Sequence, residues 1–361
     1  MSDLKITAEL MQTLDASNMF GILTSFPDHI ATAIEIGRNA PLFTNTDAPS
    51  DFVLLGMGGS AIGGDILRTY TSVTEGADHI RFHINRNYDT PKFICEKQHV
   101  IVSSYSGGTE ETLNGLEQIR RKTSNILAIT AGGELEQRAE KYGIPTVKIP
   151  GGMMPRCALA FSFFPLLFQM MRINAFGRNA INTTSNALEE LQDLLKLRAE
   201  QYSAFSDSNP AISIARKLVG SPVVVYSGCE RTDTVSLRWR GQIQENAKQL
   251  AFGSVLPEMN HNEINAWSNP ADLAKKFAVI LMQDKDDNPR NTIRFNALES
   301  IIKDSVNEVI KVQGEGRYLL TRMFDLIYLG DWVSYYLSLM NGVDPTPIPV
   351  ISKLKDILAK A

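Results

Sequence analysis

The sequence is poor in cysteine, has no long apolar run and carries no basic excess, and each shortage excludes a class of protein. Its three cysteines, Cys95, Cys157 and Cys229, form no C-x-x-C pair and no disulfide framework, which favours a reducing cytoplasm. The opening "MSDLKITAEL" lacks a basic segment followed by an apolar core, so we expect no signal peptide.

The most apolar window, residues 157–171, is shorter than the roughly 20 residues of a membrane span and contains Pro165 and Gln169. The sequence therefore predicts a buried helix there and no membrane role. The formal net charge of −4 argues against a nucleic-acid partner, which usually requires basic clusters. At 361 residues and 43% hydrophobic composition, the chain is long enough for two globular domains.

Short apolar runs alternate with helical patterns along the chain. In the first half we expect strands at 52–56, 80–85, 100–105, 125–130 and 145–150, with helices at 60–70, 109–122 and 133–143. The second half repeats the plan, with strands at 222–228, 277–283 and 307–313 and helices at 232–250, 290–305, 317–341 and after 349. Such alternation is typical of parallel sheets with helices on both faces.

The predicted fold class is therefore α/β, with two tandem doubly wound parallel sheets. We expect a helical segment at 1–45, a loop at 45–51, a first domain at 46–180 and a helical connection at 181–210. The second domain, with the C-terminal helices, would cover 211–361. Stretches 52–61 and 222–231 take equivalent places, but only the first is rich in glycine, so only the first domain allows its backbone close to an anion.

Two strand-to-helix turns in the first half have the composition of a phosphate site. "GMGGSAIGGD" (56–65) offers flexible backbone and a helix N-terminus, and we expect Gly58, Gly59 and Ser60 to bind phosphate. The spacing is not that of a nucleotide P-loop. A dinucleotide site remains an alternative, because Ala61 is allowed at the third position of G-x-G-x-x-G/A.

The second turn, "SSYSGGTEETL" (103–113), gathers hydroxyls around two glycines. Ser104, Ser106 and Thr109 are the expected phosphate donors, with Thr109 also the N-cap of the next helix. Parallel sheets bind ligands at the carboxyl ends of their strands, where both turns lie. The alternative interpretation is two ordinary turns in which serine and threonine only cap helices.

Several motifs together resemble the bifunctional phosphoglucose/phosphomannose isomerases of archaea and bacteria, which are built from two sugar isomerase (SIS) domains. They are "GMGGSAIGGD", "SYSGGTEET", "PRCAL", "QENAK", "PEMNHNEI" and "DPTPIPVISKLK", which run from residue 56 to 355. The pair "QENAK" and "NHNEI" is the most specific. The resemblance implies a metal-independent aldose–ketose isomerase, without cofactor, that interconverts glucose 6-phosphate or mannose 6-phosphate with fructose 6-phosphate through a cis-enediol.

The resemblance also assigns the acid–base residues. It implies that Glu245 is the base, that Arg156 lies over the enediolate, and that Lys355 is the active-site lysine, with Lys353 the alternative. It implies that His261 opens the sugar ring and is contributed across the interface of a homodimer. By residue type alone, the charged residues could instead be surface ion-pair residues and the histidine an ordinary one near a helix start.

Other features limit the substrates and leave two alternative functions. The four remaining histidines have no acidic or thiol partners at zinc-binding spacing, so we predict no metal. The family places a threonine near the chain end for accepting both sugar epimers; Thr346 is close, but Ile348 stands nearer in register, so glucose 6-phosphate is the firmer substrate. A non-catalytic sugar-phosphate-binding regulator and an amino-sugar phosphate isomerase remain alternatives.

Overall fold

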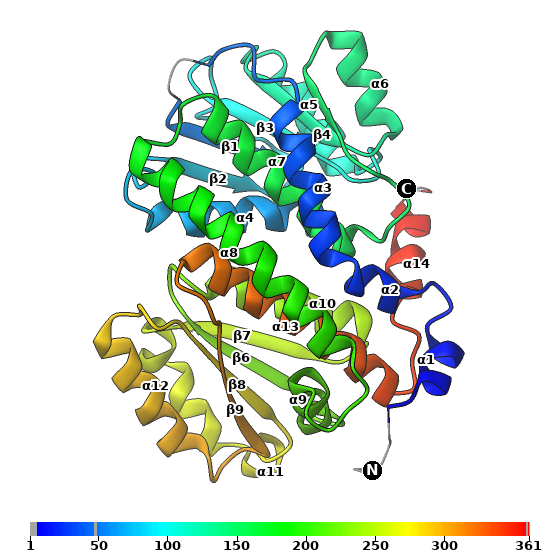
Figure 1. Cartoon of the computed structure of the whole chain (residues 1–361), viewed down its shortest axis with the longest axis vertical. Helices are drawn as coiled ribbons and strands as arrows, with labels where there is room; N and C mark the ends of the chain where they lie inside the picture. The colour runs from blue at the N-terminus through cyan, green and yellow to red at the C-terminus, as the bar shows by residue number, and fades with distance from the viewer. Residues whose placement is uncertain (1–5, 47–48, 359, 361) are drawn as a thin grey trace. The chain divides into compact units, whose positions relative to one another are not determined.

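The computed structural model describes residues 6–46, 49–358 and 360 (Figure 1). Contacts divide the chain into two compact units. The first-sheet unit comprises Ser25–Lys196 and Gly316–Arg322, and the second-sheet unit comprises Met1–Thr24, Leu197–Glu315 and Met323–Ala361. The domain boundaries expected at residues 45, 180 and 210 stay a prediction. Residues 1–5 of the expected helical segment and residues 47–48 of the expected loop lie outside the described residues.

The first-sheet unit is built on a sheet of five parallel strands in the order β2-β1-β3-β4-β5. The strands are β1 (Asp51–Leu55), β2 (Arg81–Asn85), β3 (His99–Ser103), β4 (Ile126–Thr130) and β5 (Thr146–Lys148). In the register, Leu54 of β1 lies opposite Ile84 on one side and Ile101 on the other. All five strands expected in the first half of the sequence are confirmed.

Helices cover both faces of this sheet. They are α3 (Phe26–Asn39), α4 (Gly58–Ser72), α5 (Glu110–Ile119), α6 (Gly133–Tyr142) and α7 (Leu159–Arg172). Val53 and Leu55 of β1 pack with Leu116 of α5, whereas the intervening Leu54 lies against Gly64 of α4. Alternate residues of a strand point to opposite faces, so both faces of β1 are apolar.

The apolar window at 157–171 forms α7, whose buried residues run from Leu159 to Met170. This helix packs against α3 and α4, as Figure 1 shows for α3. The predicted buried helix is confirmed. No helix in the described part of the chain is long and apolar enough to cross a membrane. Helix α8 (Arg178–Ser203) overlaps the stretch 181–210 expected to be helical, and its role as a connection between domains stays a prediction.

The second-sheet unit contains four parallel strands in the order β7-β6-β8-β9. They are β6 (Val223–Gly228), β7 (Ala251–Leu256), β8 (Ala278–Gln283) and β9 (Glu308–Gln313). The helices are α1 (Ala8–Leu14), α2 (Met19–Thr24), α9 (Pro210–Leu218), α10 (Asp233–Asn246), α11 (Ala271–Ala274), α12 (Pro289–Ile302), α13 (Leu319–Met340), which begins in the first-sheet unit, and α14 (Pro349–Leu358). In the described part of this unit, two short 3-10 turns are η2 (Glu258–His261) and η3 (Glu263–Ser268), whereas η1 (Pro155–Cys157) belongs to the first-sheet unit.

Strand β7 was absent from the sequence prediction, which ran a helix to residue 250 and placed no strand after it. A Cβ on Gly253 would overlap the carbonyl oxygen of Val225 in the neighbouring strand, so β7 needs a glycine in its centre. Because a glycine within a strand weakens the pattern from which strands are predicted, β7 was not predicted. The outer edge of β7 is covered by α10: Gln244 Nε2 donates to the Ala251 carbonyl (2.7 Å) and Arg240 to the Gly253 carbonyl (3.3 Å). The predicted α/β class with two parallel sheets is confirmed.

Candidate functional site

The candidate phosphate site begins at the carboxyl ends of β1 and β3. Strand β1 continues through α4 to β2 on one side, and β3 continues through α5 to β4 on the other. Neighbouring strands whose connections leave in opposite directions open a crevice where α/β sheets bind ligands. The glycine turn (residues 56–60) follows β1, and the hydroxyl turn (residues 104–109) follows β3. Both turns therefore lie at one edge of the first sheet.

The glycine turn approaches its neighbours too closely for any other residue type. A Cβ on Gly56 would lie 2.9 Å from the Ser103 carbonyl oxygen, and one on Gly59 would lie 2.5 Å from the Pro155 carbonyl oxygen. Gly58 starts α4 with φ +48°, a conformation that L side chains rarely adopt, and it has open space around it. The glycines thus bring the start of α4 against both the hydroxyl turn and the segment that carries Arg156.

The hydroxyl turn packs closely against Gly132 and Gly133 in the loop after β4. A Cβ on Gly107, at φ +69°, would overlap the Gly132 carbonyl oxygen, and one on Gly133 would overlap the Ser106 carbonyl oxygen. The Leu135 N–H donates to the Gly107 carbonyl (2.9 Å). The loop after β4 therefore fixes the shape of the hydroxyl turn. Sequence reasoning missed this loop, although its "AGG" follows a predicted strand and could have signalled it.

The hydroxyls of the two turns form hydrogen bonds within and between the turns. Ser104 is fully buried and its hydroxyl shares a 2.8 Å hydrogen bond with that of Thr109. Thr109 holds the predicted N-cap position of α5, yet its side chain makes no cap bond, because its hydroxyl pairs with Ser104 instead. Ser106 is exposed and accepts the Gly108 N–H (3.3 Å), and Ser60 accepts the Tyr105 N–H (2.9 Å).

Two helices begin beside these hydroxyls. The first turn of α4 contains Gly58, Gly59 and Ser60 and no acidic residue. Helix α5, which begins directly after Thr109, has Glu110 and Glu111 in its first turn, so the N-terminus of α4 is the one without a carboxylate. Helix N-termini present backbone N–H donors and a partial positive charge, which favour an anion. The arrangement can therefore hold a compact anion by backbone and hydroxyl donors.

Arg156 lies in η1, between β5 and α7, in the same unit as the two turns. Its side chain is 5% exposed. The close approach of Gly59 to the Pro155 carbonyl brings this segment to the start of α4. A second link is the Met153 N–H, which donates to the Tyr105 hydroxyl (3.0 Å). The structure thus brings Arg156's segment together with the predicted phosphate residues.

Glu245, His261 and Lys355 all belong to the second-sheet unit. Glu245 is half-buried near the end of α10, whereas His261 ends η2 and is exposed. Lys353 and Lys355 both lie on α14 with exposed side chains. The geometry of each unit therefore leaves these roles as predictions.

Helix α10, which carries Glu245, is anchored on α13 by a buried ion pair. Arg238 donates two hydrogen bonds to the Asp331 carboxylate (3.1 and 2.7 Å), and Gln242 adds a third (2.9 Å). Burial raises the pKa of Asp331, and the Arg238 guanidinium opposes that rise. Asn246 donates to Ser334 (2.9 Å) one turn further on. Arg238, Gln242 and Asn246 follow one another at intervals of four residues, a spacing that could have indicated this polar helix face from the sequence.

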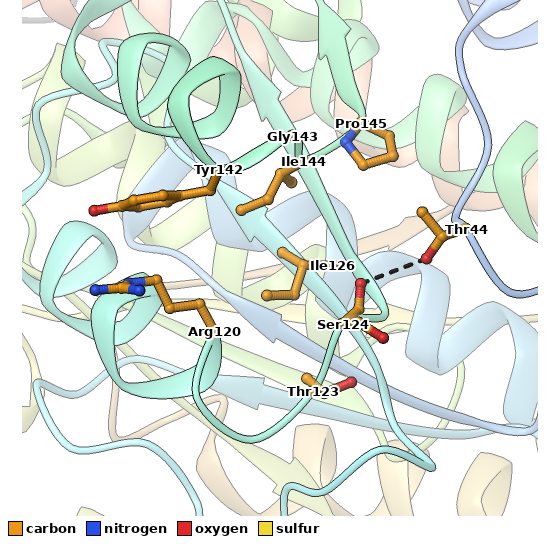
Figure 2. Close-up of a pocket in the computed structure, with 9 residues that line it drawn as sticks. All are labelled: Thr44, Arg120, Thr123, Ser124, Ile126, Tyr142, Gly143, Ile144 and Pro145. Carbon is orange, nitrogen blue, oxygen red and sulfur yellow. Dashed lines mark hydrogen bonds between the residues drawn. The ribbon is translucent and has the colours of Figure 1, made fainter.

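A separate hollow of about 480 Å³ lies at the amino ends of β4 and β5, the opposite edge of the first sheet (Figure 2). It is lined by Thr44, Arg120, Thr123, Ser124, Ile126, Tyr142, Gly143, Ile144 and Pro145. The Arg120 guanidinium lies 4.5 Å from the centre of the Tyr142 ring and is paired with Glu117 (2.6 Å). The charge of this hollow is already matched, so we assign no ligand to it.

Comparison with known proteins defines the class of the chain and then its family. Residues 207–358 match the family model described as the bacterial phospho-glucose isomerase C-terminal SIS domain. The C-terminal domain of glucosamine-fructose-6-phosphate aminotransferase from Francisella tularensis has a similar fold, with a TM-score of 0.69 at 12% identity over 90% of this chain and 97% of that one. The chain is thus a protein of two SIS domains.

Two curated relatives are bifunctional phosphoglucose/phosphomannose isomerases. That of Caldicellulosiruptor bescii is 37% identical over 95% of this chain and 99% of its own length. That of Aquifex aeolicus is 33% identical over 85% of this chain and 90% of its own length. The chain belongs to the bifunctional phosphoglucose/phosphomannose isomerase family, as the sequence motifs predicted.

Proposed function

We propose that this protein is an aldose–ketose isomerase that interconverts glucose 6-phosphate and mannose 6-phosphate with fructose 6-phosphate. The observation that carries the proposal is the convergence of the glycine turn, the hydroxyl turn and the Arg156 segment at one sheet edge. This convergence occurs in a chain that is 37% identical to the Caldicellulosiruptor isomerase over 95% of its length.

The first-sheet unit holds the phosphate of the sugar. Backbone N–H groups of Gly58 and Gly59 at the start of α4 bind its oxygens, together with the hydroxyls of Ser60, Ser106 and Thr109. The Ser60 hydroxyl accepts the Tyr105 N–H, so its own proton is available to donate to a phosphate oxygen. The buried Ser104 orients the Thr109 hydroxyl.

The reaction moves protons at C1, C2 and the ring oxygen. His261 transfers a proton from the C1 hydroxyl to the ring oxygen, which opens the sugar. Glu245 removes the proton from C2 and returns it to C1, and the C2 hydroxyl becomes the carbonyl while the C1 carbonyl becomes a hydroxyl. Arg156 supplies a permanent cation for the enediolate oxygens. Lys355 is the expected second cation, and separate glutamine replacements of Lys353 and Lys355 distinguish the two.

The catalytic test is Glu245→Gln in a coupled assay of fructose 6-phosphate conversion. Gln is the same size and cannot accept the C2 proton, so kcat should fall by about a hundredfold or more. The melting temperature should stay within about 2 °C, because the half-buried side chain keeps its shape. Glu200→Gln, at an exposed acidic residue of the same unit that lies outside the family motifs, is the matched control and should retain full activity.

Other outcomes select the alternatives. A loss smaller than tenfold in Glu245→Gln would show that another residue is the base. Thermal stabilisation by the sugar phosphate without turnover in the wild type would favour the non-catalytic regulator. Turnover of an amino-sugar phosphate, but not of fructose 6-phosphate, would favour the amino-sugar isomerase.

We further expect a cytoplasmic homodimer in which His261 completes the site of the partner copy. The exposure of His261 on η2 and the three cysteines without disulfides support this assembly and location. Mixing Glu245→Gln with His261→Gln chains tests it. A heterodimer with shared sites holds one intact site, so random mixing should restore about a quarter of wild-type activity. Sites made within one chain would stay inactive on mixing.

A further inference from the structure

Tyr105 lies in the hydroxyl turn between two predicted phosphate donors, and sequence analysis gave it no role. The residue is 9% exposed. Its backbone N–H donates to the Ser60 hydroxyl (2.9 Å), and its carbonyl accepts the Ala131 N–H (3.1 Å). Its phenol oxygen accepts the Met153 N–H (3.0 Å). One residue therefore links the glycine turn, the loop after β4 and the segment before Arg156.

The hydrogen bond between the Tyr105 hydroxyl and the Met153 N–H links Tyr105 to the segment that carries Arg156. Met153 stands three residues before Arg156, in the connection from β5 to η1. This connection contains Gly151 and Gly152, the second at φ +90°, so its own backbone is permissive. It is fixed instead by its neighbours: Gly59 packs against the Pro155 carbonyl, and Tyr105 holds Met153.

Burial keeps the Tyr105 phenol neutral, which suits it as the hydrogen-bond acceptor for the Met153 N–H. Desolvation raises the pKa of Tyr105, so the phenol is neutral across the physiological range. A neutral phenol oxygen keeps lone pairs for the Met153 N–H and adds no negative charge beside an anion site. The same residue also orients the Ser60 hydroxyl through its backbone, so it serves both ends of the site.

We propose that Tyr105 is a positioning residue that couples the phosphate cradle to Arg156, so that a sugar held by its phosphate meets the guanidinium at its enediolate oxygens. The claim rests on the proposed isomerase function. Tyr105 itself does not touch the reacting carbons; it acts through the Met153 backbone.

The test is Tyr105→Phe, which removes the phenol oxygen and keeps the ring and the backbone bonds. We expect kcat to fall about tenfold, since the Met153 N–H loses its partner and the Arg156 segment loosens. KM for fructose 6-phosphate and the inhibition constant of inorganic phosphate should stay within about twofold, because the phosphate donors are unchanged. In an Arg156→Lys background the same replacement should cost less than about twofold.

The matched control is Tyr142→Phe, which also loses a phenol hydrogen bond, to Glu117 (2.9 Å), at the opposite edge of the same sheet. It should leave kcat unchanged. Hydrogen exchange supplies a readout that needs no activity: peptides covering 150–157 should exchange faster in Tyr105→Phe and not in Tyr142→Phe.

Two results would overturn the proposal. One is unchanged exchange at 150–157 in Tyr105→Phe. The other is a raised inhibition constant for phosphate with kcat intact, which would make Tyr105 a phosphate-site residue only. Failure of the proposed function looks different: the wild type would not convert fructose 6-phosphate, and the exchange experiment would still decide whether Tyr105 holds the segment.

Discussion

The two sheets present opposite chemistry at the same topological position. At the carboxyl end of β3 the first sheet has serines, a threonine and glycines, whereas β8 of the second sheet is followed by "DKDDN". The Asp287 carboxylate accepts the Asp284 N–H (2.9 Å), and a Cβ on Gly228 would lie 2.9 Å from one of its oxygens. The second sheet thus fills with its own carboxylate the place where the first sheet is open to an anion.

The helices that leave the first strand of each sheet differ in the same way. Helix α4 starts with glycines and a serine, without an acidic residue in its first turn, whereas α10 has Asp233 there. A carboxylate in the first turn already complements the positive end of a helix. Topology alone therefore does not make a phosphate site. The residue types at the strand ends are what favours the first sheet over the second as the proposed anion site.

Glycine replacements at the ends of β1 and β6 should give the largest difference in phosphate binding and stability between the two sheets. A Cβ on Gly56 would meet the Ser103 carbonyl at 2.9 Å, and this backbone atom can move only with the hydroxyl turn. We expect Gly56→Ala to lower the free energy of unfolding by about 2–3 kcal/mol and to abolish thermal stabilisation by inorganic phosphate. Chemical denaturation and phosphate-dependent melting measure the two effects.

Gly228→Ala is the matched variant in the second sheet. The three atoms nearest to its Cβ would belong to the Asp287 side chain and not to the backbone, so we expect a loss of about 1 kcal/mol and full phosphate stabilisation. Equal losses of phosphate stabilisation in both variants would contradict the division of roles between the sheets.

Most strands could be predicted from the sequence because they are short apolar runs separated by residues that end strands. Val100, Ile101 and Val102 sit in an apolar strand followed at once by hydroxyls, and both features are visible without coordinates. Strand β7 was missed because Gly253, required by its close approach to β6, interrupts the pattern. Local pattern thus predicted every strand in the described part of the two sheets except β7.

The residue types of the candidate site could be predicted from the sequence, but the hydrogen bonds between them could not. Serines, threonine and glycines indicated a phosphate cradle, but no pattern shows that the Ser104 hydroxyl binds Thr109. The same holds for Tyr105, whose three hydrogen bonds reach residues that are 26 to 48 positions away. Such long-range links depend on the packing of the turns, which sequence spacing does not encode.

Acidification should lower the stability of the first-sheet unit more than that of the second-sheet unit, by a smaller amount than the glycine replacements. His29 and His99 belong to the first-sheet unit, and burial lowers the pKa of each below its usual 6.5. The second-sheet unit contains only His261 among the five histidines, and it is exposed. Because the unfolded chain takes up these protons first, the stabilising contribution is present above pH 6.5 and is lost as pH falls below it.

We therefore expect hydrogen exchange of peptides in 26–172 to accelerate between pH 7.5 and 5.5, after correction for intrinsic rates, more than exchange of peptides in 210–313. His99→Phe should reduce that difference, since a phenyl ring can keep the edge-on contact with Phe43 and cannot titrate, while it loses the ring hydrogen bond to the Asn45 carbonyl (2.9 Å). The exposed His79→Asn should leave it unchanged. Parallel acceleration in both units, or no effect of His99→Phe, would show that the acid sensitivity does not come from the buried imidazoles of the first sheet.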